Sequence, residues 1–300
     1  MATVQTPATT AGNVGTRKRT KAPRDKGKAG PLIRIVIAAI CVLWILPVVG
    51  TFITSLRTEQ DANTTGWWTI LTNPSLTFDN YKNVVTQADL GQAFVNSLAI
   101  ALPATFIPIL IAAFAAYAFT FMEFPGRDVL FLLIVSLLVV PNYVSFVPIL
   151  KIYASTHLAG EFPAAWLAHI GFGMSLAIYI LRNYMATLPR TIIESAQIDG
   201  ASHFQTFWRL ILPMSVPALA SFAIFQFLWV WNDLLVALVF IQPGDNAPIT
   251  VATSQLLGQQ GQNFNLVTAG GFFSLVVPVL VFLALQRYFV RGLTAGAVKG

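Results

Sequence analysis

Six long apolar stretches dominate this sequence, at residues 32–56, 92–120, 129–150, 163–182, 214–241 and 266–288. A helix that crosses about 30 Å of hydrocarbon needs about 20 mostly apolar residues. None of the stretches alternates with a period of two, so helices are expected rather than barrel strands. Charged residues make up only 10% of the chain, against about 25% in soluble domains. The sequence therefore predicts an all-α polytopic membrane protein with six transmembrane helices.

The basic residues predict how these helices are oriented. If the six stretches cross the membrane in turn, fifteen of the 18 Lys and Arg residues lie on the side of the N-terminus. The opposite side keeps Arg57, Lys82 and Lys151. Basic residues accumulate in cytoplasmic loops, so both termini are expected in the cytoplasm. The predicted organisation, in order, is a tail at 1–31, a first helix with its extracytoplasmic segment at 32–91, a core at 92–288 and a C-terminal tail at 289–300.

The net charge of +6 is concentrated in residues 17–28, which hold seven Lys or Arg and one Asp. The remainder of the chain is formally neutral, so a nucleic-acid partner is not expected. The tail at 1–31 lacks a periodic apolar face, and we expect it to be a disordered basic segment that touches anionic lipid. Within the extracytoplasmic segment, Trp67 and Trp68 suit either an interfacial aromatic belt or a small docking surface.

Several classes of chemistry are missing from the sequence. The single cysteine, Cys41, excludes a disulfide framework and a cysteine-based metal site. The three histidines are far apart in the sequence, and no phosphate-binding G-x-x-x-x-G-K-[ST] motif occurs. The chain is therefore not expected to be an enzyme, to carry a cofactor or metal, or to hydrolyse nucleotide itself.

The loop at 183–213 is longer and more apolar than an ordinary connection between spans. Two N-terminal capping boxes are predicted in it, Thr191 with Glu194 and Ser202 with Gln205. Gly200 suits the left-handed conformation that ends a helix. The loop is therefore expected to form two short helices joined by a tight elbow, an arrangement that suits either insertion into a groove on a partner protein or attachment to the lipid surface.

This loop resembles the signature loop of bacterial ABC-importer permeases, E-A-A-x3-G-x9-I-x-L-P. The matching residues are Glu194, Ser195, Ala196, Gly200, Leu212 and Pro213. Ser195 replaces the usual Ala, and Leu210 replaces the usual Ile. Asp199, Ala201, the run Trp231-Asn232-Asp233 and the C-terminal residues 292–300 are further similar to the carbohydrate-importing branch, in its six-span second (maltose-type) permease.

The resemblance implies a type I ABC-importer permease core in a bacterial inner membrane, and a division of labour between chains. The loop, with Phe204 included, would dock on a cytoplasmic ATPase, where ATP and Mg would bind. The partners of the whole chain would be a second permease, two ATPase subunits and an extracytoplasmic sugar-binding protein. ATP-driven closure of the ATPases would switch the permease pair between inward- and outward-facing states. The sugar itself is left open.

Polar residues inside the spans are candidates for a sugar pathway, because a sugar needs hydrogen-bonding groups and an aromatic face. The candidates for this pathway are Asn96, Gln226, Trp229, Asn232 and Asp233. Asn142, Tyr143 and Ser145 are further polar residues of the third stretch. Asp233 suits a substrate contact, a tie between helices or a local helix cap. Asn96 equally suits a hydrogen bond between helices.

Two other functions fit a protein of six membrane helices. An ion-coupled secondary transporter of small polar solutes usually needs several membrane carboxylates or an internal repeat, and this chain offers Asp233 alone. A membrane enzyme would need a nucleophile with a base, or a metal cluster, and neither pattern is present. The permease interpretation is therefore preferred.

Overall fold

The computed structural model describes residues 30–86, 88–258 and 263–297, in which all regular secondary structure is helical. Four helices in these ranges are long and apolar enough to cross a membrane, namely α1 (Pro31–Ser55), α4 (Leu90–Phe121), α7 (Phe162–Met185) and α13 (Phe264–Ala297). Two bent helix pairs bring the candidate spans to six. The prediction of an all-α membrane protein is confirmed, while the orientation of its termini stays a prediction.

The structure describes only part of each predicted tail. Residues 1–29 lie outside them, and α1 already begins at Pro31. The predicted C-terminal tail, 289–300, continues α13 as a helix as far as Ala297, and the last three residues lie outside. Residues up to Pro47 and residues from Val48 onward form two separate units. The apolar side chains of the first unit, from Leu32 to Leu46, are exposed, as in a helix surrounded by lipid.

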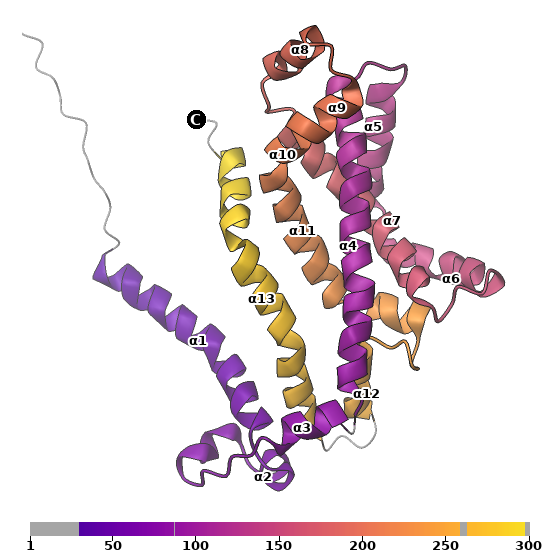
Figure 1. Cartoon of the computed structure of the whole chain (residues 1–300). Coiled ribbons are helices and arrows are strands. Elements are labelled where there is room, and N and C mark those ends of the chain that lie inside the picture. Colours follow the sequence, from indigo (N-terminus) through magenta and orange to yellow (C-terminus); the bar gives the residue numbers. More distant parts are fainter. Residues whose placement is uncertain (1–29, 87, 259–262, 298–300) are drawn as a thin grey trace, which may run out of the picture. The chain divides into compact units, whose positions relative to one another are not determined.

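The third apolar stretch, 129–150, is not one straight helix but a pair of bent halves. It consists of α5 (Arg127–Ser136), η2 (Leu137–Val139), η3 (Asn142–Ser145) and α6 (Phe146–Ser155). The two halves meet at 93°, and Figure 1 shows α6 turned aside from α5. Pro141 stands at the corner, where it has no N–H for a helical bond and holds the preceding Val140 in an extended conformation.

The fifth stretch, 214–241, is likewise not one continuous helix. α11 (Val216–Trp231) ends ten residues before the predicted end, and a second helical segment containing η5 (Ala237–Ile241) follows the break at Asn232. At its beginning, α11 meets the segment His203–Met214 at 71°. Pro213 and Pro217 flank this bend and remove two backbone donors.

The core forms where α4 packs against α7 and α11, and where α11 packs against α13. Figure 1 shows these helices side by side. Ala112 and Ala116 of α4 are fully buried in one cluster with Ala177 of α7. Residues this small let helix backbones approach closely, which is the main source of helix association in lipid. The small-x3-small spacing of Ala112 and Ala116 therefore lies at a helix contact.

The segment between α1 and α4 contains α2 (Glu59–Thr64), η1 (Trp67–Leu71) and α3 (Asp79–Thr86). Arg57 is 2% exposed and donates to the carbonyl of Thr65 at 2.9 Å and to the hydroxyl of Thr69 at 3.0 Å. Asn80 donates to the carbonyls of Ser55 and Arg57 and accepts from Asn265 of α13 at 2.8 Å. These bonds tie the segment to the end of α1 and to the start of α13.

The two tryptophans of this segment have different surroundings. Trp67 lies so close to Gly50 that a β-carbon there would stand 2.7 Å from the indole Nε1, whereas the Trp68 side chain is 62% exposed. Nearby, the hydroxyls of Ser75 and Thr58 donate to Asp61 and hold the pKa of that carboxyl below its usual value. Trp67 is therefore a packing residue, and Trp68 is free to contact lipid or another protein.

Candidate functional site

The loop at 183–213 folds as two helical segments joined by a glycine turn. α8 (Arg190–Ile198) ends at Asp199, and Gly200 follows with φ +77°. The N–H of Gly200 donates to the carbonyl of Gln197 at 3.0 Å, and the N–H of Ala201 donates to the carbonyl of Ala196 at 2.9 Å. These two bonds are the Schellman arrangement, which places a glycine in the left-handed position. The elbow expected at Gly200 is confirmed.

The second segment begins as the sequence predicted, and the first does not. Ser202 and Gln205 form a complete capping box at α9 (His203–Thr206). The predicted box of Thr191 and Glu194 is wrong, because α8 starts at Arg190, with Pro189 as its N-cap two residues before Thr191. Thr191 therefore already lies inside the helix, where its hydroxyl does not act as a cap. Figure 1 shows α8 and α9 at the same end of the molecule as the start of α5.

Each segment of the loop has a buried face and an exposed face. Ile193 and Ala196 of α8, and Phe207 and Ile211 of η4 (Phe207–Ile211), belong to the core. Ile198 is 86% exposed and Phe204 is 66% exposed. A loop that buries some of its apolar residues and exposes others has a surface suited to a protein partner or lipid.

The buried face is attached to α4 by aromatic contacts and by one polar contact. Phe207 stacks on Phe114 with ring centroids 4.4 Å apart. The Tyr117 hydroxyl lies 3.0 Å from Nδ1 of His203 at the start of α9. These contacts attach the loop to α4, one of the candidate membrane spans.

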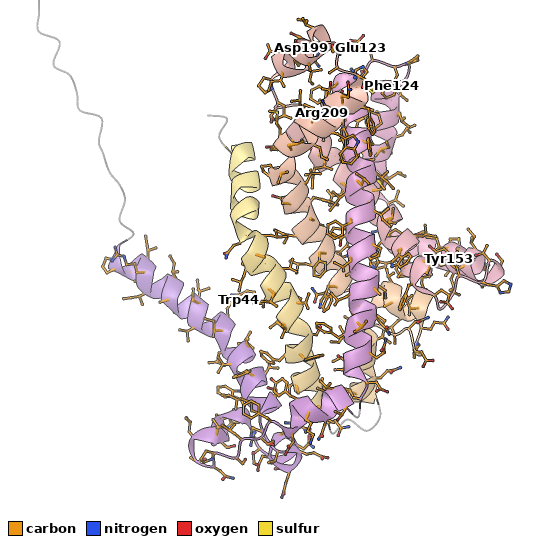
Figure 2. The ribbon with its side chains drawn as sticks, viewed as in Figure 1. Trp44, Glu123, Phe124, Tyr153, Asp199 and Arg209 are labelled. Carbon is orange, nitrogen blue, oxygen red and sulfur yellow. The ribbon has the colours of Figure 1, made fainter. Side chains whose placement is uncertain are left out.

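The residues of the predicted docking surface are thus mostly accessible. Glu194, Ser195, Asp199, Gly200, Phe204 and Pro213 are exposed, Ala201 and Leu212 are half-buried, and Ala196 is buried. Figure 2 shows Asp199 at the tip of this end of the molecule. Accessibility meets the first requirement of a docking surface, while the docking role itself stays a prediction.

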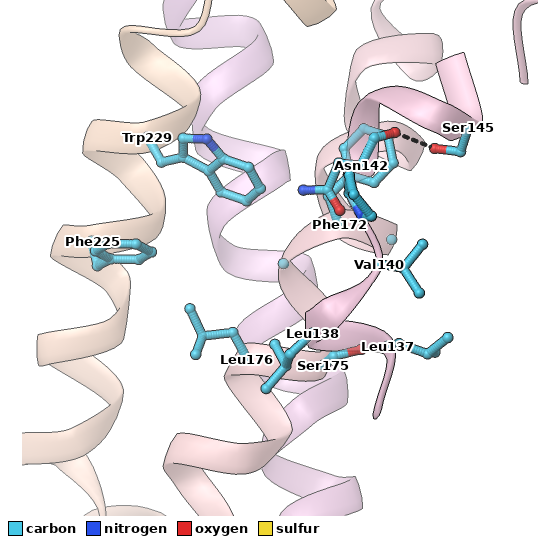
Figure 3. Close-up of a pocket in the computed structure, with 13 residues that line it drawn as sticks. Leu137, Leu138, Val140, Asn142, Ser145, Phe172, Ser175, Leu176, Phe225 and Trp229 are labelled. Atoms are coloured by element: carbon cyan, nitrogen blue, oxygen red, sulfur yellow. Dashed lines mark hydrogen bonds between the residues drawn. The ribbon is translucent and has the colours of Figure 1, made fainter. Parts of the chain in front are cut away.

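A groove of about 490 Å³ lies beside the corner at Pro141, between η2–η3, α7 and α11. Figure 3 shows Trp229 and Phe225 of α11 on one side, with Asn142, Phe172 and Ser175 across from them. Ser145 donates to the carbonyl of Asn142 at 2.6 Å. Aromatic faces opposite a few amide and hydroxyl groups make a surface of the kind that binds sugars.

The five pathway candidates separate into different environments. Trp229 lines the groove, and its ring meets His169 edge-on with centroids 5.7 Å apart. Asn232 is exposed and donates to the carbonyl of Leu228 at 2.7 Å. Of the five, Trp229 is therefore the one that the structure places in this groove.

Gln226 and Asn96 are buried between helices. Gln226 is fully buried and donates to the carbonyls of Ala104 in α4, at 3.2 Å, and His169 in α7, at 3.3 Å. Asn96 donates to the carbonyls of Asp245 and Ala247 at 2.7 and 3.1 Å. Each therefore ties α4 to another part of the core.

Sequence reasoning left out Phe172 and Ser175, it interpreted Phe225 as a packing residue on the face of Trp229, and it named Asn142 and Ser145 only as polar residues of the third stretch. Pro141 followed by Asn142 was the available signal, because a proline next to an amide inside an apolar stretch marks a corner. The three helices that form the groove are distant in the sequence, and no local pattern pairs them.

Asp233 caps the helical segment that follows the break. Its Oδ1 accepts from the N–H of Val236 at 2.7 Å, and its carbonyl accepts from the Thr250 hydroxyl at 3.0 Å. The alternative of a local helix cap thus has direct geometric support.

Asn and Asp are about equally good N-caps, and losing a cap costs about 1 kcal/mol. We therefore expect Asp233→Asn to keep normal uptake and stability, and Asp233→Ala to lower the thermal midpoint of the purified protein by a few degrees. The uptake rate and the thermal midpoint should be measured for both variants. If Asp233→Asn folds normally and loses uptake, the negative charge acts on the substrate, and the cap is not its main role.

Comparison with known proteins adds information to this geometry. The family model described as "Binding-protein-dependent transport system inner membrane component" matches residues 108–295. The osmoprotective compounds uptake permease protein GgtD of Synechocystis is 54% identical over 272 residues, covering 89% of this chain and 91% of that protein. The alpha-glucoside transport system permease protein AglG of Rhizobium meliloti is 55% identical over 240 residues, which are 78% of this chain and 63% of that protein.

A solved structure has the same fold. It is a chain of a bacterial ABC transporter involved in the import of the acidic polysaccharide alginate, and it aligns with a TM-score of 0.73. The alignment covers 90% of this chain and 99% of that one, at 17% sequence identity.

Proposed function

The chain belongs to the family of binding-protein-dependent transport system inner membrane components, and from this premise we propose how its loop and its groove act. It is a membrane-spanning permease subunit of an ABC importer. The proposed division of labour assigns nucleotide hydrolysis, with ATP and Mg, to two separate cytoplasmic ATPase subunits. A second permease would complete the pathway, and an extracytoplasmic binding protein would deliver the substrate.

The observation that carries this proposal is the helix–Gly200 turn–helix unit. Its tip is exposed and its inner face is packed on α4 through Phe207 and Tyr117. We propose that the tip, from Glu194 to Phe204, docks in a cleft on the ATPase. ATP-driven closure of the ATPases would then move the loop as a rigid lever and switch the core between two states. The orientation that this requires places both termini in the cytoplasm and the protein in the bacterial plasma membrane. A cysteine at the exposed Asn63, labelled from outside the cell, would check it.

The proposed substrate is a sugar or oligosaccharide. The name of the relative from Rhizobium meliloti supports an α-glucoside, and the name of the Synechocystis relative supports an osmoprotective compound. Of the five pathway candidates, we propose that Trp229 faces the substrate. Asn232 would lie at the open end of α11, while Asn96, Gln226 and Asp233 would hold the helices that shape the path.

The proposal is tested by comparing sugar uptake in two strains. One expresses the complete transporter, and the other expresses every subunit except this chain. We expect loss of the chain to remove uptake of one or more α-linked glucosides while leaving an unrelated monosaccharide unaffected. Radiolabelled sugars across a panel of mono- and oligosaccharides provide the measurement. Unchanged uptake of every sugar in a strain lacking the chain would contradict the sugar assignment, and co-purification of an ATPase subunit would separately test the importer assignment.

A further inference from the structure

Three arginines surround a cavity of about 70 Å³ at the end of the molecule that carries the loop. Arg127 is the first residue of α5, Arg182 lies near the end of α7, and Arg190 begins α8. Phe119, Thr120 and Phe121 of α4 complete most of the lining. The cavity is separate from the groove at Trp229, and it lies where the connection from α4 to α5 meets the connection from α7 to α8.

Two of the three arginines at this cavity have no ion-pair partner within the described part of the chain. Arg127 forms an ion pair at 3.1 Å with Asp128, a residue whose side chain is 85% exposed. Among the described residues, no carboxylate lies within 4.0 Å of Arg182 or Arg190. Three guanidinium groups around a small cavity therefore create a site that favours an anion.

Arg182 provides an independent observation. Its guanidinium carbon lies 4.8 Å from the centroid of the Phe131 ring, and its Nη1 donates to Asn183 at 3.4 Å. Its Nε is buried and has no hydrogen-bond partner among the described residues. A buried donor without an acceptor is costly, so an oxygen ligand in the cavity would remove this cost.

The surroundings favour a lipid as the source of that oxygen. Beyond Arg127, α5 exposes Val129, Leu130, Leu132 and Leu133, with exposed fractions of 47–67%. An acyl chain can lie along these side chains while its headgroup reaches the arginines. Arginine pairs with phosphate oxygens through two parallel hydrogen bonds, and anionic lipids are concentrated in the cytoplasmic leaflet.

We propose that the cavity lined by Arg127, Arg182 and Arg190 binds the phosphate of an anionic phospholipid headgroup. The proposal rests on the proposed function for one point, the cytoplasmic side of the loop. Because the site joins α4, α5 and α7 to the start of α8, a bound headgroup would fasten the base of the loop to the membrane core.

The test measures retained lipid on the full-length protein, purified with its partners and exchanged into nanodiscs containing phosphatidylcholine and a small fraction of phosphatidylglycerol. Native mass spectrometry counts the phosphatidylglycerol molecules that remain bound. We expect Arg182→Gln and Arg190→Gln each to weaken retention about fivefold, the factor expected for one basic residue at an anionic surface. Arg209→Gln is the matched control, since Arg209 is exposed at the same end and does not line the cavity. If Arg182→Gln fails to fold, Arg182→Lys replaces it in the test, because lysine keeps the positive charge but cannot form the two parallel hydrogen bonds of arginine to a phosphate.

Three results would overturn the proposal. The first is equal retention by the wild type and by both cavity variants. The second is displacement of the lipid by inorganic phosphate at equal concentration, which would identify a free anion as the ligand. The third is loss of the ATPase subunit from the cavity variants with lipid retention unchanged, which would assign the arginines to a protein contact. Failure of the proposed function would appear differently, as absence of the ATPase from the wild-type preparation while the lipid stays bound.

Discussion

Replacing Gly200 by valine should abolish transport while the permease remains in the membrane. Gly200 has φ +77°, and no atom lies within 4 Å of the position that a β-carbon would occupy there. The cost inside this chain is therefore backbone strain, roughly 1–2 kcal/mol for a left-handed residue and more for a β-branched one. Relief of that strain would redirect Phe204 and disrupt the proposed docking surface. We expect ATPase co-purification and substrate uptake to fall at least tenfold.

Gly126 provides the matched control for this experiment. It also has φ +77° with nothing within 4 Å of a β-carbon, and it precedes α5 at the same end of the molecule. Gly126→Val should therefore impose similar strain without touching the docking surface, and the ATPase should remain bound. Equal uptake by the Gly200→Val and wild-type proteins would refute the docking role of the turn.

Reversing the charge at Glu194 tests the same surface without backbone strain. Glu194 is exposed and lies in the middle of α8, beyond the first turn, so it does not cap the helix. A docking hot spot contributes about 2–4 kcal/mol, so Glu194→Lys should weaken ATPase binding roughly 30-fold or more. Gly200→Val and Glu194→Lys should be compared in one pull-down series that measures the bound ATPase, with the abundance of the permease measured by immunoblot.

The second large effect is expected at Trp229. Removal of its ring from the groove by Trp229→Ala should raise the KM for substrate about 30-fold or more, since an aromatic anchor in a pocket typically contributes at least about 2 kcal/mol. Trp229→Phe keeps a flat apolar face and should recover part of the affinity. The measurement is uptake at varied substrate concentration, together with ATPase co-purification, which should not change.

Trp44 is the control for the loss of a tryptophan. It belongs to α1, its side chain is 76% exposed, and it does not line the groove. Trp44→Ala should therefore leave KM unaltered. A normal KM and maximal rate in Trp229→Ala would show that the substrate passes along a different surface.

Local sequence determined those parts of the protein that depend on neighbouring residues. In lipid, the backbone N–H and C=O groups of a single run of about 20 apolar residues can pair with each other only if the run is a helix. The helical membrane class therefore followed from the stretches themselves. The turn at Gly200 and the capping box of Ser202 and Gln205 each depend on a few adjacent residues. The box predicted from Thr191 failed because Pro189, two residues earlier, is the N-cap of α8.

The tertiary structure decided the roles of side chains that depend on distant partners. Gln226, Trp229 and Asp233 lie within eight residues of each other, yet one ties three helices, one lines a groove and one caps a helical segment. The groove joins Asn142, Ser175 and Trp229 from three elements, and the arginine cavity joins residues 127, 182 and 190. Sequence determines the residue type and its helix, whereas the neighbours of a side chain follow only from how the helices cross and where their prolines bend them.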